Sequence, residues 1–306
     1  MQLNIIQKRK YAYVFSLLVT GAAIVCVLIY GLRLGIDFKG GTLMEVRFSE
    51  TAVPAADMVR EKLGAIELQS LTLQPTGERG MLMRYLASDE TTNDKVLATL
   101  KEIDPSVEQL RVDFIGASVS DQMQRQAFGG TLLALLGIAL YIAWAFRRVS
   151  YPVTSWEYGA GAIIALAHDI IITIGVFSLL GHFYGVEVGV PFIAALLTIL
   201  GYSVNDTIVV YDRVRENLLR ARSGTDFEMI VNRSLNETLV RSVNTSLTVI
   251  IVLIAVAVFG GESVRWFAVA LLVGVGFGTY SSIFVASALL VSRFKMKFPD
   301  KIVTSH

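Results

Sequence analysis

The sequence predicts a multi-pass α-helical membrane protein with six transmembrane helices and a small α+β domain between the first two helices. Hydrophobic residues make up 54% of the 306 positions, whereas a soluble globular chain usually has about 45–50% with glycine included. Six apolar runs are long enough to cross a bilayer, which takes roughly 20 residues. One polar segment separates the first run from the second.

Each of the six apolar runs predicts one transmembrane helix. They lie near residues 11–30, 127–146, 158–180, 188–211, 239–259 and 266–291. Among the short segments, Lys and Arg gather before the first run and after the second, fourth and sixth runs, whereas residues 181–187 contain none and residues 260–265 contain one. Short cytoplasmic segments are enriched in Lys and Arg, so we expect both termini in the cytoplasm. The expected organisation is an N-terminus with helix 1, an outer domain, helices 2–6 and a cytoplasmic tail, over residues 1–31, 32–124, 125–292 and 293–306.

The outer segment, residues 32–124, alternates between strand and helix patterns. Strands are expected at residues 40–48, 67–75, 81–87 and 107–116, and helices at 54–66 and 92–103. Pro54 is expected at the start of the first of these helices, and Asp104-Pro105 at the end of the second. The order β-α-β-β-α-β is that of a ferredoxin-like unit. We therefore expect a ferredoxin-like periplasmic domain.

Ionisable side chains interrupt three of the apolar runs. An Asp at a helix centre costs about 2.5–3.5 kcal/mol by insertion scales, so it usually faces a protein interior or a wet cavity. His168 and Asp169 are neighbours in the third run, and we expect them not to face each other, because adjacent helix positions point about 100° apart. At 1.5 Å per residue, Asp169, Asp206 and Arg241 lie about 17, 22 and 27 Å from the outer face.

Asp206 and Arg241 are thus expected at similar depths and can form an ion pair if the fourth and fifth helices are neighbours. Arg keeps its proton, so Arg241 would hold Asp206 ionised or release it as a helix moves. Asp206, Asp169 and His168 can carry protons, and Asn205 can donate to a carboxylate or bridge helices. The alternative interpretation is a structural ion pair that registers two helices without transport. Both interpretations stay open.

Other features of the sequence narrow the class of protein. Gly274 and Gly278 form a GxxxG pattern, which favours close helix packing. The stretch GIDFKGG precedes a strand instead of following one, so it is a poor phosphate cradle, and no P-loop or catalytic motif occurs. One cysteine, Cys26, and three scattered histidines predict no metal or cofactor. The net charge of +1 is too small to indicate electrostatic attraction to nucleic acid. We therefore expect a protein that is not an enzyme and is driven by an ion gradient or a partner.

Five stretches together resemble one known family. They are LGIDFKGGTLMEV, ALAHDIIITIG, FIAALLTILGYSVNDTIVVYDRVREN, SLNETLVRSVNTSLTVI and GTYSSIFVASALL. Over essentially its whole length the chain is similar to the SecF-type members of the SecD/SecF family, in the resistance–nodulation–division superfamily. The resemblance implies a multi-pass protein of the bacterial cytoplasmic membrane with a periplasmic domain after its first helix.

The resemblance also implies partners and site residues. Family members pair with SecD, whose similar half completes a twelve-helix unit, and they associate with the SecYEG channel, YajC and SecA. They are thought to use the proton motive force to promote export of an unfolded preprotein. The family's charged residues linked to ion movement fall on Asp206 and Arg241, and its histidine–aspartate pair falls on His168 and Asp169. Ala288 stands where members often carry proline, so a proline kink is not expected there.

Three functions stay open on the sequence alone. The first is an auxiliary subunit of the secretory translocon that couples proton flow to motion of the outer domain. The second is one half of a small-molecule/proton antiporter of the same superfamily, for which the outer segment is short. The third is a structural partner of the translocon that moves no ions. The coupling ion can be H⁺ or Na⁺, because a carboxylate suits either.

Overall fold

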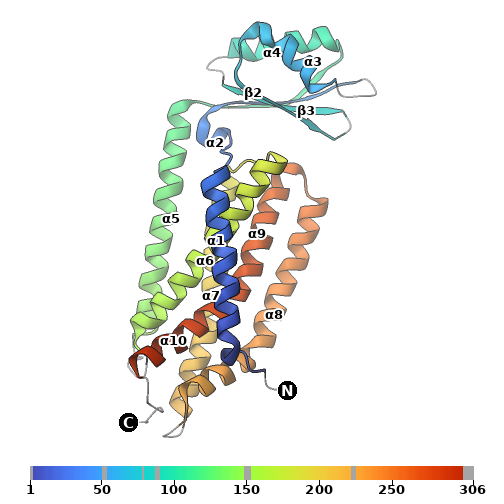
Figure 1. The fold of residues 1–306 in the computed structure, drawn as a ribbon. Coiled ribbons are helices and arrows are strands. Elements are labelled where there is room, and N and C mark those ends of the chain that lie inside the picture. Colours follow the sequence, from blue (N-terminus) through green and yellow to red (C-terminus); the bar gives the residue numbers. More distant parts are fainter. Residues whose placement is uncertain are drawn as a thin grey trace. The chain divides into compact units, whose positions relative to one another are not determined.

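The computed structural model describes residues 3–49, 54–77, 79–86, 90–147, 153–221 and 225–298 (Figure 1). The chain divides into two compact units. The helical unit comprises Met1–Arg33 and Gly129–His306, and the sheet unit comprises Leu34–Phe128. Each unit has a hydrophobic core of its own.

Six helices in the described chain are long and apolar enough to cross a membrane, which confirms the predicted number of spans. At 1.5 Å per residue, helices of this length exceed the roughly 30 Å of a bilayer's hydrocarbon core. The first five are α1 (Arg9–Tyr30), α5 (Ala117–Ala145), α6 (Ser155–Tyr184), α7 (Val190–Arg220) and α8 (Phe227–Phe259). The sixth consists of α9 (Glu262–Ser281), a π-helical segment (Ser282–Ala286) and α10 (Ser287–Lys297).

Local sequence signals explain several helix ends. The backbone N–H of Thr154 donates to Glu157 Oε2 at 2.7 Å, which completes a capping box at the start of α6. Pro191 lies in the first turn of α7, as is common for proline. The start of α8 near residue 239 was predicted wrongly, because its first turns are amphipathic and fall outside the apolar run. They bury Ile230 and Leu235, and the helix begins after its cap Asp226.

The centre of the helical unit is formed by α6, α7 and the α9–α10 span. Of their apolar stretches 44–56% is buried, compared with 6–11% in α1, α5 and α8. Tyr158 and Tyr211 pack edge to face in this core, with ring centroids 5.0 Å apart. The outer helices keep large apolar side chains exposed, such as Leu133 and Val252. Such surfaces suit contact with lipid or with another membrane protein.

The GxxxG glycines lie where α9 packs against α7. A Cβ added at Gly274 would lie 2.2 Å from Ile199 Cδ1, and one added at Gly278 would lie 3.1 Å from Ser203 Cβ. A larger residue at either position would therefore push the two helices apart.

The sixth span is interrupted by a π-helical segment. Figure 1 shows that α10 departs from the direction of α9 after this segment. Ser287, the first residue of α10, donates its Oγ proton to the carbonyl oxygen of Ser282 at 3.0 Å. π-turns are an ordinary cause of helix bending. The chain therefore changes direction beside Ala288 without the proline that the resemblance associates with a kink.

The sheet unit has the predicted order of strands and helices. Its strands are β1 (Gly41–Arg47), β2 (Gln69–Thr76), β3 (Gly80–Leu86) and β4 (Glu108–Ile115). They form one antiparallel sheet in the spatial order β2-β3-β1-β4. The helices α3 (Ala56–Leu63) and α4 (Glu90–Ile103) cover one face, where Val59 and Leu100 pack on Met44 and Met83. A short helix, α2 (Ile36–Lys39), precedes β1.

Most boundaries in the sheet unit differ from the prediction by one to three residues, and two of these differences have a clear local cause. Pro54 lies before α3 and is not its first residue, because Ala55 is the N-cap. The strand expected from residue 67 begins at Gln69, because Glu67 has a left-handed backbone conformation with φ 54° that no strand accommodates. By contrast, α4 ends at Ile103, directly before Asp104-Pro105 as predicted.

The adjacent glycines Gly40 and Gly41 let β1 enter the centre of the sheet. Their φ angles are 73° and 112°. A Cβ on Gly41 would lie 2.7 Å from the carbonyl oxygen of Tyr85 on β3, and one on Gly40 would lie 3.2 Å from that of Ile115 on β4. The glycine pair is thus needed for close approach of three backbones, a different role from binding phosphate.

Candidate ion-coupling site

Asp169 lies on α6 and is fully buried. Its Oδ2 accepts hydrogen bonds from Ser203 Oγ on α7 at 2.6 Å and from Ser281 Oγ on α9 at 2.8 Å. Its Oδ1 lies 3.0 Å from His168 Nδ1. Three helices therefore meet at this carboxylate. Gly278 borders it, since a Cβ there would lie 3.6 Å from Oδ2.

The expectation that His168 and Asp169 do not face each other was wrong. Their Cα–Cβ bonds diverge as adjacent helix positions must, but the side chains are long enough to turn toward each other. The His168 ring also stacks on Tyr280, with centroids 6.2 Å apart. Its Nε2 is buried and has no hydrogen-bond partner in the described chain.

Asp206 lies on α7 and is half-buried. Its Oδ1 accepts a hydrogen bond from Ser242 Oγ on α8 at 2.5 Å. Its Oδ2 accepts one from Ser282 Oγ, the first residue of the π-helical segment. Both carboxylate oxygens are therefore satisfied by hydroxyl groups of neighbouring spans.

The expected ion pair between Asp206 and Arg241 is not formed in the part of the chain that the structure describes. The neighbouring Ser242 points at Asp206, so Arg241 is directed about 100° away around α8 and is exposed. Its side chain lines an open cavity of about 460 Å³ between α7 and α8, together with Ile208, Glu237 and other residues. Asn205 is also exposed, and no hydrogen bond joins it to either carboxylate.

Further hydroxyl groups continue from Ser242 along α8. Ser246 Oγ donates to the carbonyl oxygen of Ser242 at 2.9 Å, lies 2.5 Å from Thr279 Oγ1 and accepts a hydrogen bond from Tyr202 at 3.1 Å. Thr207 Oγ1, next to Asp206 in sequence, is buried without a partner among the described residues. A band of hydroxyl groups thus crosses α7, α8 and α9 within otherwise apolar spans.

The sequence alone does not assign the serines at positions 203, 242, 281 and 282 to the carboxylates that they bind. A signal was present, because Ser281 and Ser282 are adjacent and Ser242 and Ser246 are four residues apart, on one face of α8. Small hydroxyl residues are, however, so common at membrane helix interfaces that the pattern alone does not identify a carboxylate partner.

A separate ionic network lies near the ends of α7 and α8. Glu237 accepts hydrogen bonds from Arg213 at 2.7 Å, Arg233 at 2.9 Å and Asn217 at 2.8 Å. Close by on α8, Asn232 Oδ1 accepts from the backbone N–H of Ile5 at 2.9 Å. These hydrogen bonds hold the N-terminal segment, α7 and α8 together.

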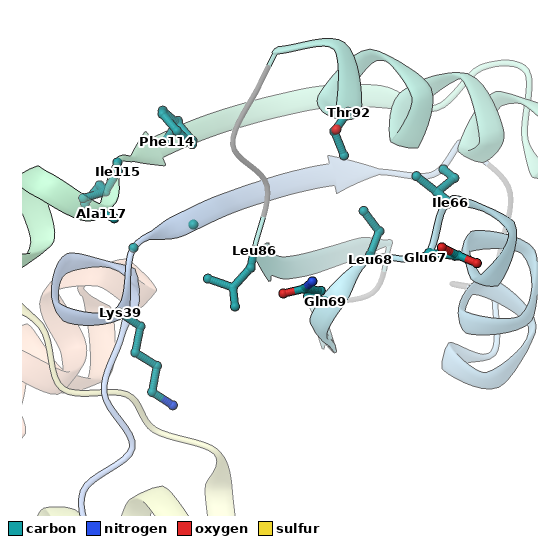
Figure 2. A pocket seen from close by; sticks show the side chains of 13 residues that line it. Lys39, Ile66, Glu67, Leu68, Gln69, Leu86, Thr92, Phe114, Ile115 and Ala117 are labelled. Atoms are coloured by element: carbon teal, nitrogen blue, oxygen red, sulfur yellow. The ribbon is translucent and has the colours of Figure 1, made fainter.

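A cavity of about 600 Å³ lies in the sheet unit, at the end of the sheet where β1 begins (Figure 2). Its lining includes the Gly40–Gly41 pair, and its charged residues are Lys39 and Glu67. Figure 2 shows these two side chains on opposite sides of the cavity. No group of three potential metal-ligating residues occurs in the described part of the chain. The two carboxylates with their hydroxyl donors lie within apolar spans and can take up a proton or a cation there.

Models of one known protein family match most of the chain. The model of the protein export membrane protein SecD/SecF C-terminal family matches residues 95–296, and the SecD/SecF GG motif matches residues 27–52. The chain belongs to the SecD/SecF family. The GG motif region contains Gly40 and Gly41, whose close approach to β3 and β4 gives a physical reason for a glycine pair in this family.

Relatives within the SecD/SecF family cover almost all of the chain. The protein translocase subunit SecF of Thermobaculum terrenum is 44% identical over 95% of this chain and 93% of its own length. That of Anaerolinea thermophila is 38% identical over 94% and 93%. The crystal structure of SecDF, a translocon-associated membrane protein from Thermus thermophilus, matches with a TM-score of 0.84 and 33% identity. The match covers 96% of this chain and 39% of that one.

Proposed function

We propose that this chain is an auxiliary subunit of the Sec preprotein translocase that works with SecD and uses the proton motive force to promote protein export. The observation that carries the proposal is the pair of hydroxyl-bound carboxylates, Asp169 and Asp206, within the membrane spans of a chain whose relatives are named translocase subunits. The role is that of a translocase component and not of an enzyme.

Protonation of these carboxylates supplies the link between ion movement and helix movement. An ionised Asp in a bilayer is costly, and hydroxyl donors stabilise its charged form. Uptake of a proton removes the charge and weakens these charge-assisted hydrogen bonds. The donors come from α7, α8 and the α9–α10 span, so protonation loosens the contacts between these helices. Each charge that crosses the membrane brings about 2.3 kcal/mol per 100 mV.

The site residues differ in role. Asp206 is half-buried and exchanges the ion. Asp169, together with His168, forms a second protonation site that is more deeply buried. Arg241 and Asn205 lie on the exposed surface of the helical unit and act where the SecD half covers that surface. Their effect on Asp206 therefore depends on the assembled pair. The coupling ion is H⁺, and Na⁺ is the alternative that flux measurements separate.

The proposal includes an orientation of the chain in the membrane and a set of partners. The sheet unit is a ferredoxin-like domain on the periplasmic side, supported by its element order and the strand order β2-β3-β1-β4. Both termini are cytoplasmic, supported by the distribution of Lys and Arg. The exposed apolar faces of α1, α5 and α8 leave room for SecD, consistent with a match to 39% of the SecDF chain. SecYEG, YajC, SecA and the unfolded preprotein complete the set of partners.

Replacement of Asp206 tests the proposal. In the chain co-reconstituted with SecD and the channel, Asp206→Asn should reduce ion flux to that of empty vesicles and export to its level without a gradient. The amide keeps the shape but cannot carry the charge. Asp212→Asn, at an exposed position further along α7, is the matched control and should leave both quantities unchanged. Normal flux and export in an assembled Asp206→Asn complex would favour a purely structural partner.

A further inference from the structure

Two adjacent residues on one helix bind the two different carboxylates. Ser281 Oγ donates to Asp169 on α6 at 2.8 Å, and Ser282 Oγ donates to Asp206 on α7. Both serines are fully buried. Because successive helix positions point about 100° apart, a single stretch of backbone lies between the two sites and faces both.

Each of these hydroxyl groups has a second acceptor within reach on its own helix. Ser281 Oγ lies 3.1 Å from the carbonyl oxygen of Gly278, and Ser282 Oγ lies 3.1 Å from that of Thr279. A serine hydroxyl carries one proton to donate. It therefore donates either to the carboxylate or to the carbonyl three residues earlier, and a negatively charged acceptor is preferred.

Ser281 and Ser282 lie where the helix changes from α to π geometry. Ser281 ends α9 and Ser282 begins the π-helical segment. π-bulges are rare and frequently occur at functional sites. Local shifts between α and π geometry at this point would change the direction of Ser282 relative to Ser281.

We infer that Ser281 and Ser282 are a paired positioning device, which holds both carboxylates in their ionised form and releases each to a helix carbonyl when that carboxylate takes up a proton. The inference rests on the proposed function, since it assigns the residues that tune and connect the two ion-binding groups. It extends that function to a specific segment, the junction between α9 and the π-helical turn.

Other titratable groups near the pair are few in the described spans. His168 on α6 lies against Asp169, and the ring of Tyr280 on α9 stacks on His168. Tyr280 also bonds to Ser16 and to the backbone of α1. On α7, Tyr202 is bonded to Ser246, and on α8 Arg241 is directed outward. The serines are therefore the direct donors from the sixth span to both carboxylates.

The test measures ion flux against pH in the full chain reconstituted with SecD. Ser281→Ala and Ser282→Ala remove one donor each, and alanine preserves helix propensity. A hydrogen bond to a charged group contributes about 1.5–3 kcal/mol, so each variant should move the midpoint of the profile to higher pH by about one unit or more. Ser178→Ala, which removes a buried hydroxyl bonded to backbone carbonyls alone, should coincide with the wild type.

A double-mutant comparison separates positioning from general disturbance. If Ser281 acts through Asp169, then Ser281→Ala should move the pH midpoint of the Asp169 carboxylic acid band in an infrared titration, which does not depend on flux. In an Asp169→Asn background the same variant should leave the Asp206 band unmoved. A shift of the Asp206 band by Ser281→Ala in that background would overturn the inference, as would wild-type flux profiles for both serine variants while Asp206→Asn abolishes flux. Undiminished flux in Asp206→Asn itself would instead overturn the proposed function.

Discussion

A buried carboxylate requires donors, and at Asp169 and Asp206 these donors are mainly serine hydroxyls from neighbouring helices. A hydroxyl costs little to place in a membrane span, because it can bond to its own helix when the carboxylate does not need it. A guanidinium, by contrast, keeps its positive charge when the carboxylate becomes neutral. At the residue scale, the choice of serine therefore suits a carboxylate whose charge changes during a cycle.

Outside the membrane spans, we expect the hydrogen bonds that Asp104 accepts from Ser49 and Ser106 to be sensitive to acid. The Ser106 hydroxyl and the backbone N–H groups of Ser49 and Ser106 donate to its carboxylate and lower its pKa to about 2. The unfolded value is about 3.9, so the stabilisation is complete above about pH 5 and disappears as the pH falls to about 2. In the full chain, unfolding of the sheet unit should depend less on acid in Asp104→Asn than in the wild type.

Hydrogen exchange of the strand amides over this pH range measures the effect of Asp104→Asn. Gln109→Ala, a neutral exposed position on β4, is the control and should retain the wild-type acid dependence. Identical pH dependence in Asp104→Asn and the wild type would show that the contact contributes nothing to folding.

At the element scale, strand β1 depends on the glycine pair at its entry. Gly41→Ala places a Cβ 2.7 Å from the Tyr85 carbonyl oxygen and also has an unfavourable φ of 112°. Gly77 has a positive φ of 60° with no atom near its missing Cβ, so Gly77→Ala shows the cost of backbone strain alone, about 1–2 kcal/mol. Gly41→Ala should destabilise the sheet unit by roughly 1–3 kcal/mol more.

The measurement for the glycine pair is amide protection of β1 and β3 in the full chain, converted to a free energy of opening. Equal losses in Gly41→Ala and Gly77→Ala would contradict the close-approach argument, because both positions have a positive φ and only Gly41→Ala adds the clash.

Across the whole molecule, the sequence predicted the spans and the sheet unit because these depend on hydropathy and periodicity along the chain. The partners of Asp206 depend on which helix faces which, and hydropathy does not contain that information. Arg241 and Ser242 are adjacent, and helix rotation decided which of them meets the carboxylate. The start of α8 was missed for a related reason, since its amphipathic first turns lie outside the apolar window.

The central claim for the whole molecule is that Asp169 and Asp206 change protonation inside the membrane. Infrared difference spectroscopy of the reconstituted chain with SecD, between alkaline and acidic buffer, tests this most directly. The account predicts carboxylic acid C=O bands that appear on acidification, of which one is lost in Asp206→Asn and another in Asp169→Asn. Difference spectra of both variants that are identical to the wild type would contradict it.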